Sequence, residues 1–199
     1  MKKLLLFFVV ISLSGFGQTA EDYFNRGNVK CDLEDFTGAI SDYNKSIQLD
    51  PANANTYFNR GNAKDNLQDY KGAISDFNKA IRLDPYFAYA YNNRGLAKNN
   101  LQDYRGAIAD YNKAIQLNPD YAIAYCNRGL AKDNLKDYRG AITDYNKAIQ
   151  LKPDDAKTYF NRGCTKYKFN DKNGACLDWS TAGELGYSDA YTNIQTYCK

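Results

Sequence analysis

The sequence contains no histidine, and this absence excludes most of the common chemistry of active sites and metal sites. A serine or cysteine nucleophile lacks its usual base when no imidazole is present. The five cysteines include no CxxC pair, so without histidine they do not form a usual zinc-ligand set. The chain also lacks a GxxxxGK phosphate loop and a GxGxxG motif. We therefore predict a protein that is not an enzyme and that needs no cofactor or metal.

Long hydrophobic runs are almost absent as well. The one long apolar run, residues 4–13, follows two lysines and is far shorter than the roughly 20 apolar residues of a membrane-spanning helix. Small residues follow it, with Gly15 and Gly17 placed as a signal peptidase requires, so that Gln18 becomes the new N-terminus. We predict that residues 1–17 are a cleaved secretory signal and that the mature protein is exported, to the periplasm or out of the cell. A membrane anchor is the competing interpretation.

An excess of charge of one sign is also missing. The formal net charge of the whole chain is +3, and removal of the two lysines near the N-terminus lowers it to about +1. A chain this close to neutrality has no electrostatic reason to bind nucleic acid or an anionic membrane. We expect no nucleic-acid partner and no membrane insertion once the signal is cleaved.

The sequence does contain a repeat with a period of 34 residues. Its clearest marks are glycines and prolines at this spacing: Gly27, Gly61, Gly95, Gly129 and Gly163, and Pro51, Pro85, Pro119 and Pro153. The phrase DYRGAIADYNKAIQLNP at 103–119 recurs almost unchanged in the neighbouring units. A fixed period of 20 to 50 residues indicates an array of stacked structural units.

Each unit is predicted to contain two helices. When repeat position 1 is placed at Ala20, apolar or small residues recur at helical spacing within positions 1–14 and again within positions 17–30. Aspartate at position 16 is placed to cap the second helix, and proline at position 32 ends the unit. Glycine at position 8 and alanine at position 20 lack bulk and would allow the two helices to approach closely. Aromatic residues at positions 4 and 24 would fill the wider gaps.

These features resemble the tetratricopeptide repeat family. The pattern is Tyr-x3-Gly, then Ala-x3-(Tyr/Phe)-x2-Ala, then x4-Pro, and it covers 20–189. The resemblance implies an all-α, right-handed superhelical solenoid of antiparallel helix pairs within a domain of residues 18–189. The five repeats would be 20–53, 54–87, 88–121, 122–155 and 156–189. In this family the first helix of each pair lines a concave groove, which usually binds a peptide or another protein.

The fifth unit departs from the repeat pattern. Cys176 replaces isoleucine and Tyr187 stands where proline is expected. We predict that residues 190–199 form a capping helix over the last apolar face, as terminal repeats require for solubility. Adjacent packed helices would then bring Cys176 and Cys198 together as a disulfide, with Cys164–Cys198 as the alternative pairing. Cys31 would remain free.

Position 6 is asparagine in every unit, and in the family this position faces the groove. We call the set the Asn row: Asn25, Asn59, Asn93, Asn127 and Asn161. An amide both donates and accepts hydrogen bonds, so the row could hold the backbone of an extended peptide. The alternative is that these amides bond to their own scaffold, and the sequence does not decide between the two. The other predicted groove residues are Asn62, Tyr89, Asn92, Leu96 and Leu130.

Charged residues also recur in register. Arginine at position 7 and aspartate at position 23 are present in all five units, and their opposite signs favour a structural bridge over a charged surface for a ligand. Lysine at position 26 is expected to pair with the aspartate three residues before it on the solvated face of the second helix. The predicted function is a scaffold that binds a protein or an extended peptide in its groove. The alternative is a self-associating structural component, hence a possible homo-oligomer.

Overall fold

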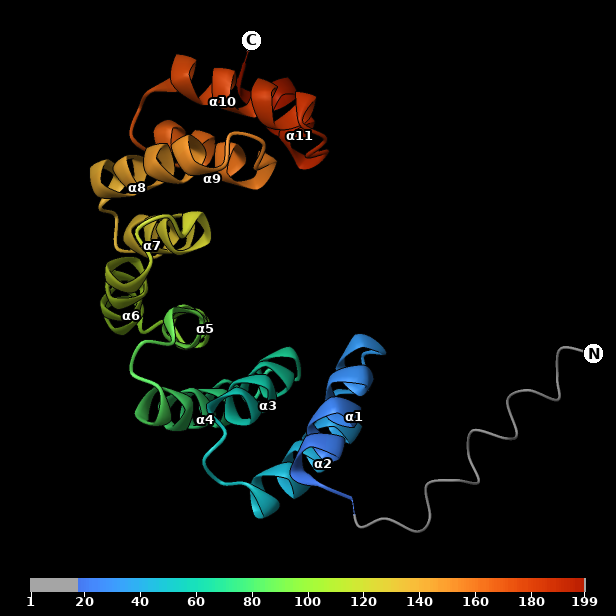
Figure 1. Cartoon of the computed structure of the whole chain (residues 1–199). Coiled ribbons are helices and arrows are strands. Elements are labelled where there is room, and N and C mark those ends of the chain that lie inside the picture. Colours follow the sequence, from blue (N-terminus) through green and yellow to red (C-terminus); the bar gives the residue numbers. More distant parts are fainter. Residues whose placement is uncertain (1–17, 199) are drawn as a thin grey trace, which may run out of the picture.

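The computed structural model describes residues 18–198, and all regular secondary structure in that range is helical (Figure 1). The predicted signal, residues 1–17, lies outside the described residues. The helices are α1 (Ala20–Asp32), α2 (Phe36–Leu49), α3 (Ala54–Asn66), α4 (Tyr70–Leu83), α5 (Ala88–Asn100), α6 (Tyr104–Leu117), α7 (Ala122–Asn134), α8 (Tyr138–Leu151), α9 (Ala156–Lys168), α10 (Lys172–Glu184) and α11 (Asp189–Tyr197). None of these helices is long and apolar enough to cross a membrane.

Helices α1 to α10 form five consecutive antiparallel pairs, and each pair packs against the next. Figure 1 shows the pairs stacked into an arc, with the odd-numbered helices on its inner side and the even-numbered helices on its outer side. The odd-numbered helices of neighbouring pairs also contact one another along the inner side. The prediction of an all-α solenoid is confirmed, and its concave surface is formed by the first helix of each pair.

The turn within each pair depends on two local features. Two residues after the first helix ends, the chain reverses direction at a residue with positive φ, for example Gln68 at 62°. The carboxylate of Asp69 then accepts a hydrogen bond from the Gly72 amide at 2.9 Å and caps the second helix, as predicted. A Cβ on Gly72 would lie only 2.0 Å from the Asp69 carboxylate, so a larger residue there would displace the capping side chain. The same cap occurs in all five units.

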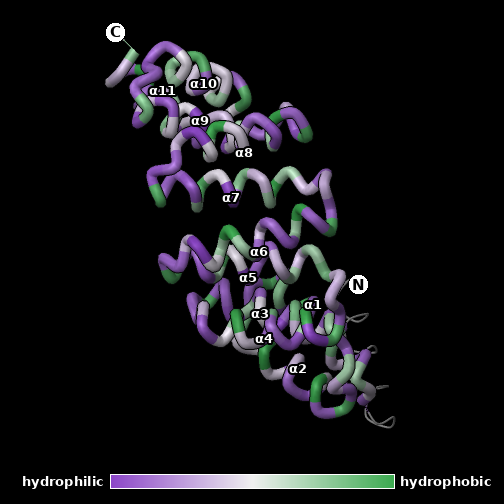
Figure 2. Tube along the Cα trace, turned by 90° about the vertical axis from the view of Figure 1, so that its left-hand side faces the viewer, coloured by the Kyte–Doolittle hydropathy of each residue, from purple (hydrophilic) through white to green (hydrophobic). Residues whose placement is uncertain are grey.

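The core is a row of small and aromatic side chains between the inner and outer helices. In the third unit Ala107 is fully buried, and the ring of Tyr111 is 1% exposed. A Cβ on Gly95 would lie 2.7 Å from this ring, which confirms that glycine at position 8 permits the close approach of the helices. Figure 2 shows hydrophobic and hydrophilic residues alternating along the helices, as expected when each helix buries one face.

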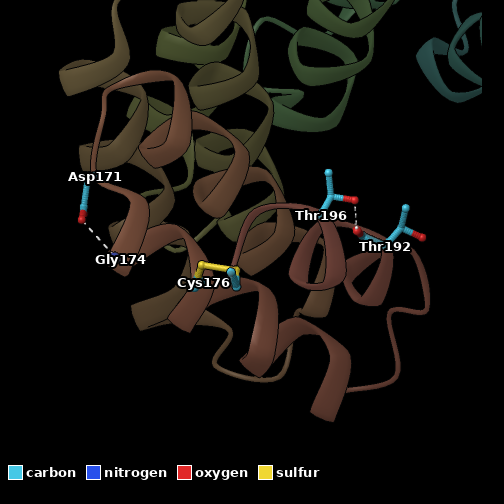
Figure 3. Close-up of a disulfide and its surroundings, with 6 residues drawn as sticks. Asp171, Gly174, Cys176, Thr192 and Thr196 are labelled. Atoms are coloured by element: carbon cyan, nitrogen blue, oxygen red, sulfur yellow. Dashed lines mark hydrogen bonds between the residues drawn. A yellow bond between two sulfur atoms is a disulfide. The ribbon is translucent and has the colours of Figure 1, made fainter.

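The C-terminal end of the solenoid is covered by α11, which packs on α10. Trp179 of α10 is 1% exposed and packs against Tyr167 of α9 and Tyr197 of α11. The structure joins Cys176 of α10 to Cys198, with 5.8 Å between their Cα atoms, and so selects this pair over Cys164–Cys198 (Figure 3). Cys164 packs nearby as a free thiol, and Cys31 and Cys126 are also free.

Candidate concave binding surface

The Asn row lies along the inner helices and joins neighbouring repeats. Asn25 is exposed, while the other four members are partly buried. Each of these four donates its side-chain N–H to the preceding repeat: Asn59 to Asn28 Oδ1 at 2.9 Å, Asn93 to Asn62 Oδ1 at 2.8 Å, Asn127 to Asn92 Oδ1 at 3.1 Å, and Asn161 to Cys126 Sγ at 3.9 Å. The amide donors therefore bond to the scaffold, which was one of the two alternatives from the sequence.

The carbonyl oxygens of the row are used differently from its N–H groups. Asn93 Oδ1 accepts a hydrogen bond from Asn92 at 3.0 Å. The oxygens of Asn59, Asn127 and Asn161 accept none from the described residues. The scaffold bond holds each of these amides by its N–H group and leaves the acceptor capacity of its oxygen unused within the described residues.

Asn92 was predicted as a groove residue, but its side chain is buried. Its side chain is 3% exposed and is held between neighbouring inner helices, where it accepts from Asn127 and donates to Asn93. A ligand in the groove would not touch it. Asn92 therefore supports the Asn row from beneath and is not a direct groove contact. Sequence reasoning missed this because asparagine at position 5 is polar enough to read as exposed.

A cavity on the inner side with a largely apolar lining lies where α5, α7 and α9 meet. We call it the middle pocket, and it has a volume of about 210 Å³. It is lined by Leu96, Ile123, Cys126, Asn127, Leu130, Asp155, Lys157 and Asn161. Ile123 is 55% exposed at its mouth. Burial raises the pKa of the Cys126 thiol, so this side chain is neutral at pH 7 and forms part of the apolar wall.

The predicted groove residues are divided between separate places. Leu96 and Leu130, together with two members of the Asn row, are brought together in the middle pocket. Asn62 instead lines a second cavity of about 350 Å³ between the first two repeats, the N-terminal pocket. Tyr89 lies outside both pockets and packs edge-on against Tyr121 with 5.1 Å between ring centroids. Burial, with a smaller contribution from Tyr89, raises the pKa of Tyr121 to about 12.

The recurring charged residues form ion pairs within each repeat and a hydrogen bond to the preceding repeat, and we call this cluster the buttress. In the third unit Arg94 and Lys98 of α5 bind the Asp110 carboxylate of α6 at 2.5 Å and 2.7 Å. Asp110 is 4% exposed. Arg94 also donates to Asn78 of the preceding repeat at 2.6 Å. The bridge interpretation is therefore confirmed, and its bonds to the neighbouring unit join successive repeats.

The predicted lysine partner of the aspartate was wrong, although the arginine partner was correct. Its lysine comes from position 11 on the facing helix, as Lys98 does for Asp110, and not from position 26 on the same helix. The aspartate points between the helices, whereas Lys113 at position 26 lies outside and donates to Gln116 at 3.1 Å. Sequence spacing suggested the local pair because position 26 lies three residues after position 23 on the same helix.

Family models identify the class of protein that this helical array represents. The model described as TPR repeat matches residues 27–65 and 98–133, and the one described as Tetratricopeptide repeat matches residues 54–87 and 122–155. Together they match more than half of the chain. The chain therefore belongs to the tetratricopeptide repeat family, whose members are generally non-enzymatic scaffolds for protein–protein interaction. A search of curated protein sequences finds no match.

Several solved structures are similar to the chain. A crystal structure of MamA is 30% identical, with 83% of this chain and 96% of that chain covered and a TM-score of 0.74. MamA from Desulfovibrio magneticus RS-1 is 23% identical, with coverages of 86% and 97% and a TM-score of 0.78. YrrB is 21% identical, with coverages of 89% and 93% and a TM-score of 0.71. The last two show that the fold is shared.

Proposed function

We propose that the protein is a non-enzymatic scaffold that binds an extended peptide segment in its concave groove, with the middle pocket as the main contact. The observation that carries this proposal is the composition of that pocket. Three aliphatic side chains and a neutral thiol surround a space that the described residues leave open, and Asn127 and Asn161 of the Asn row also line it. An apolar ligand side chain would fill the space while the ligand backbone bonds to the amides.

The size of the pocket limits its occupant. A volume of about 210 Å³ suits one or two side chains and is small for a whole drug-sized ligand. Asp155 and Lys157 at the rim have opposite charges, so the pocket has no strong preference for a charged ligand. The proposed ligand is therefore a largely uncharged stretch with an apolar residue at its centre. YrrB, which shares the fold, is described as a TPR protein with an unusual peptide-binding site.

A peptide-display selection tests the proposal. Residues 18–199 would be presented with a library of random 12-residue peptides, and selected peptides would be measured against two variants. Ile123→Gln changes the mouth of the pocket at an exposed position and is expected to lower affinity about tenfold, because loss of one apolar contact costs about 1.5 kcal/mol. Leu177→Gln, on the outer helix α10 at a 70% exposed position, is the matched control. Failure to select any peptide, or equal binding to both variants, would overturn the proposal.

We also propose that the protein acts after export. The support is the sequence of residues 1–17 together with the Cys176–Cys198 pair, because disulfides persist in oxidising compartments. Mass spectrometry of the protein from its native cells tests this. A mature N-terminus at Gln18 and three alkylatable thiols without reductant are expected, and an intact N-terminus with five reactive thiols would contradict export.

Self-association is a second candidate function, and the N-terminal end of the solenoid favours it. Val29 occupies the repeat position where Ala63, Ala97 and Ala131 are buried, yet it is 56% exposed, and Leu33 beside it is 74% exposed. This apolar face of α1 is the one that inner helices elsewhere bury against the preceding repeat. Light scattering over a range of concentrations distinguishes the two functions: a mass that rises with concentration and falls with Val29→Lys supports association.

A further inference from the structure

Repeat position 12 lies on the inner side of the solenoid, and its occupants differ from unit to unit. In the first unit Cys31 lines the N-terminal pocket between α1 and α3. In the fourth unit Asp133 lies between α7 and α9 and binds residues of α9. Position 12 therefore faces the seam between neighbouring inner helices. In the second unit this position is Asp65 at the seam between α3 and α5.

Asp133 shows which hydrogen-bond donors a carboxylate at position 12 can bind within the chain. Thr165 donates to one of its oxygens at 2.9 Å, and the ammonium group of Lys168 binds the other at 2.5 Å. With these partners Asp133 is 6% exposed. A buried carboxylate in this position thus takes one hydroxyl donor and one cation from the next inner helix.

Asp65 has neither of these donors. At the positions equivalent to Thr165 and Lys168, α5 carries Ala97 and Asn100. The described residues form no ion pair with Asp65, and its Oδ1 atom is buried without a hydrogen-bond partner. Burial raises the pKa of this carboxyl, as expected for a desolvated acid without a compensating charge.

No donor among the described residues is bonded to Oδ1 of Asp65, although the hydroxyl of Tyr111, whose pKa is raised by burial, lies near enough for the Asp65 charge to raise that pKa further. Tyr43 in the first unit contacts the position-12 side chain, Cys31, at 3.4 Å through its hydroxyl, but the equivalent residue in the second unit is Phe77. The next position-12 residue, Asn99, also has a buried amide oxygen without a partner. Two side-chain oxygens at neighbouring position-12 residues are therefore buried without a donor, and an unpaired buried acceptor costs free energy until a donor is supplied.

We propose that Asp65 binds a basic side chain, a lysine ammonium or an arginine guanidinium, of the peptide that occupies the groove, in the place that Lys168 fills beside Asp133. The inference rests on the proposed peptide-binding function and specifies its ligand: an apolar residue for the middle pocket and a basic residue toward the second repeat. Such a charge-assisted hydrogen bond in a partly desolvated site is stronger than one between neutral groups.

A first experiment tests the cation site without a ligand. Asn100→Lys supplies from α5 the group that Lys168 supplies from α9, and we expect it to raise the melting temperature by about 2–4 °C. The rise should vanish in an Asp65→Asn background. Asn134→Lys is the matched control, because it places a lysine at the same position of the next inner helix, where the facing residue is the neutral Asn99. An equal effect of Asn100→Lys with and without Asp65 would overturn the inference.

A second experiment uses the 12-residue peptide library. Peptides selected on the wild-type chain are expected to contain a lysine or arginine, and replacement of that residue by alanine should weaken binding about tenfold or more. The same loss is expected with Asp65→Asn and with Asn100→Lys, which fills the site internally. Selection of peptides without a basic residue would overturn this inference and leave the groove function standing. Selection of no peptide would overturn both.

Discussion

The buttress of Arg94, Lys98 and Asp110 allows a quantitative test of what joins the repeats. The change is Asp110→Asn, which keeps the size of the side chain and removes its charge. Oδ1 of Asp110 accepts from Arg94 Nη2 at 2.5 Å, and Oδ2 accepts from Arg94 Nε at 2.9 Å and from Lys98 at 2.7 Å. An amide accepts on one side only, so in either orientation its NH₂ group faces N–H donors.

The magnitude follows from burial. Asp110 is 4% exposed, whereas the side chains of Arg94 and Lys98 are 17% and 23% exposed. Water therefore reaches the cations only in part, and the lost bonds are not replaced by solvent. Breaking a buried ion pair by removing one partner costs about 3–5 kcal/mol. Asn78→Ala removes only the bond from Arg94 to the preceding repeat and should cost about 1 kcal/mol.

Urea unfolding followed by circular dichroism measures both variants against the wild type. Hydrogen exchange then locates the damage, because in a repeat array each unit contacts only its neighbours. For Asp110→Asn we expect fast exchange in α5 and α6 and unchanged protection in α9 and α10. A loss of stability no larger than that of Asn78→Ala would refute the argument that the buried charge matters more than the single bond between repeats.

Three further predictions concern other contacts. The hydrogen bonds from Arg26 and Lys30 lower the pKa of Asp42 to about 2, so its contribution to stability is present above pH 3.8 and is lost as the pH falls toward 2. Urea unfolding should show that the free energy of unfolding decreases by about 2 kcal/mol over this range, and that Asp42→Asn lacks this decrease. Gly95→Ala is expected to lower stability by about 1–3 kcal/mol, because the new Cβ would lie 2.7 Å from a buried ring, and an unchanged melting temperature would contradict this. Cys198→Ser removes a disulfide between residues 22 apart and should lower the free energy of unfolding by about 3 kcal/mol. Hydrogen exchange should become faster in α11 and stay unchanged in α3.

Much of the scaffold could be predicted from the sequence because its determinants are local or repeated in register. The cap of Asp69 on the Gly72 amide depends on residues three apart. The close approach of the two helices was predictable from the lack of bulk of the glycine at position 8. The Cys176–Cys198 pair was favoured over Cys164–Cys198 because a capping helix was expected to pack on the last repeat, and the structure selects it. These features need no knowledge of how one repeat sits on the next.

The bonds of the groove surface could not be predicted, because they depend on the contact between repeats. Whether Asn59 faces a ligand or its own scaffold is decided by Asn28, which lies 31 residues away in sequence. The burial of Asn92 is decided by Asn127 in the same way. A pattern read within one repeat contains no information on these distances, so the sequence left both alternatives open.

The distribution of unsatisfied groups indicates where specificity lies in this chain. The charged side chains that recur in every repeat, such as Arg94 and Asp110, are paired within the scaffold and have little left to offer a ligand. Position 12 varies, and there Asp133 is satisfied by α9 while Asp65 is left without a donor on an otherwise equivalent seam. An unpaired buried oxygen lowers stability, and that cost is offset only when a donor arrives from outside the chain. The recurring residues thus build the groove, and the residues that break the repeat select what enters it.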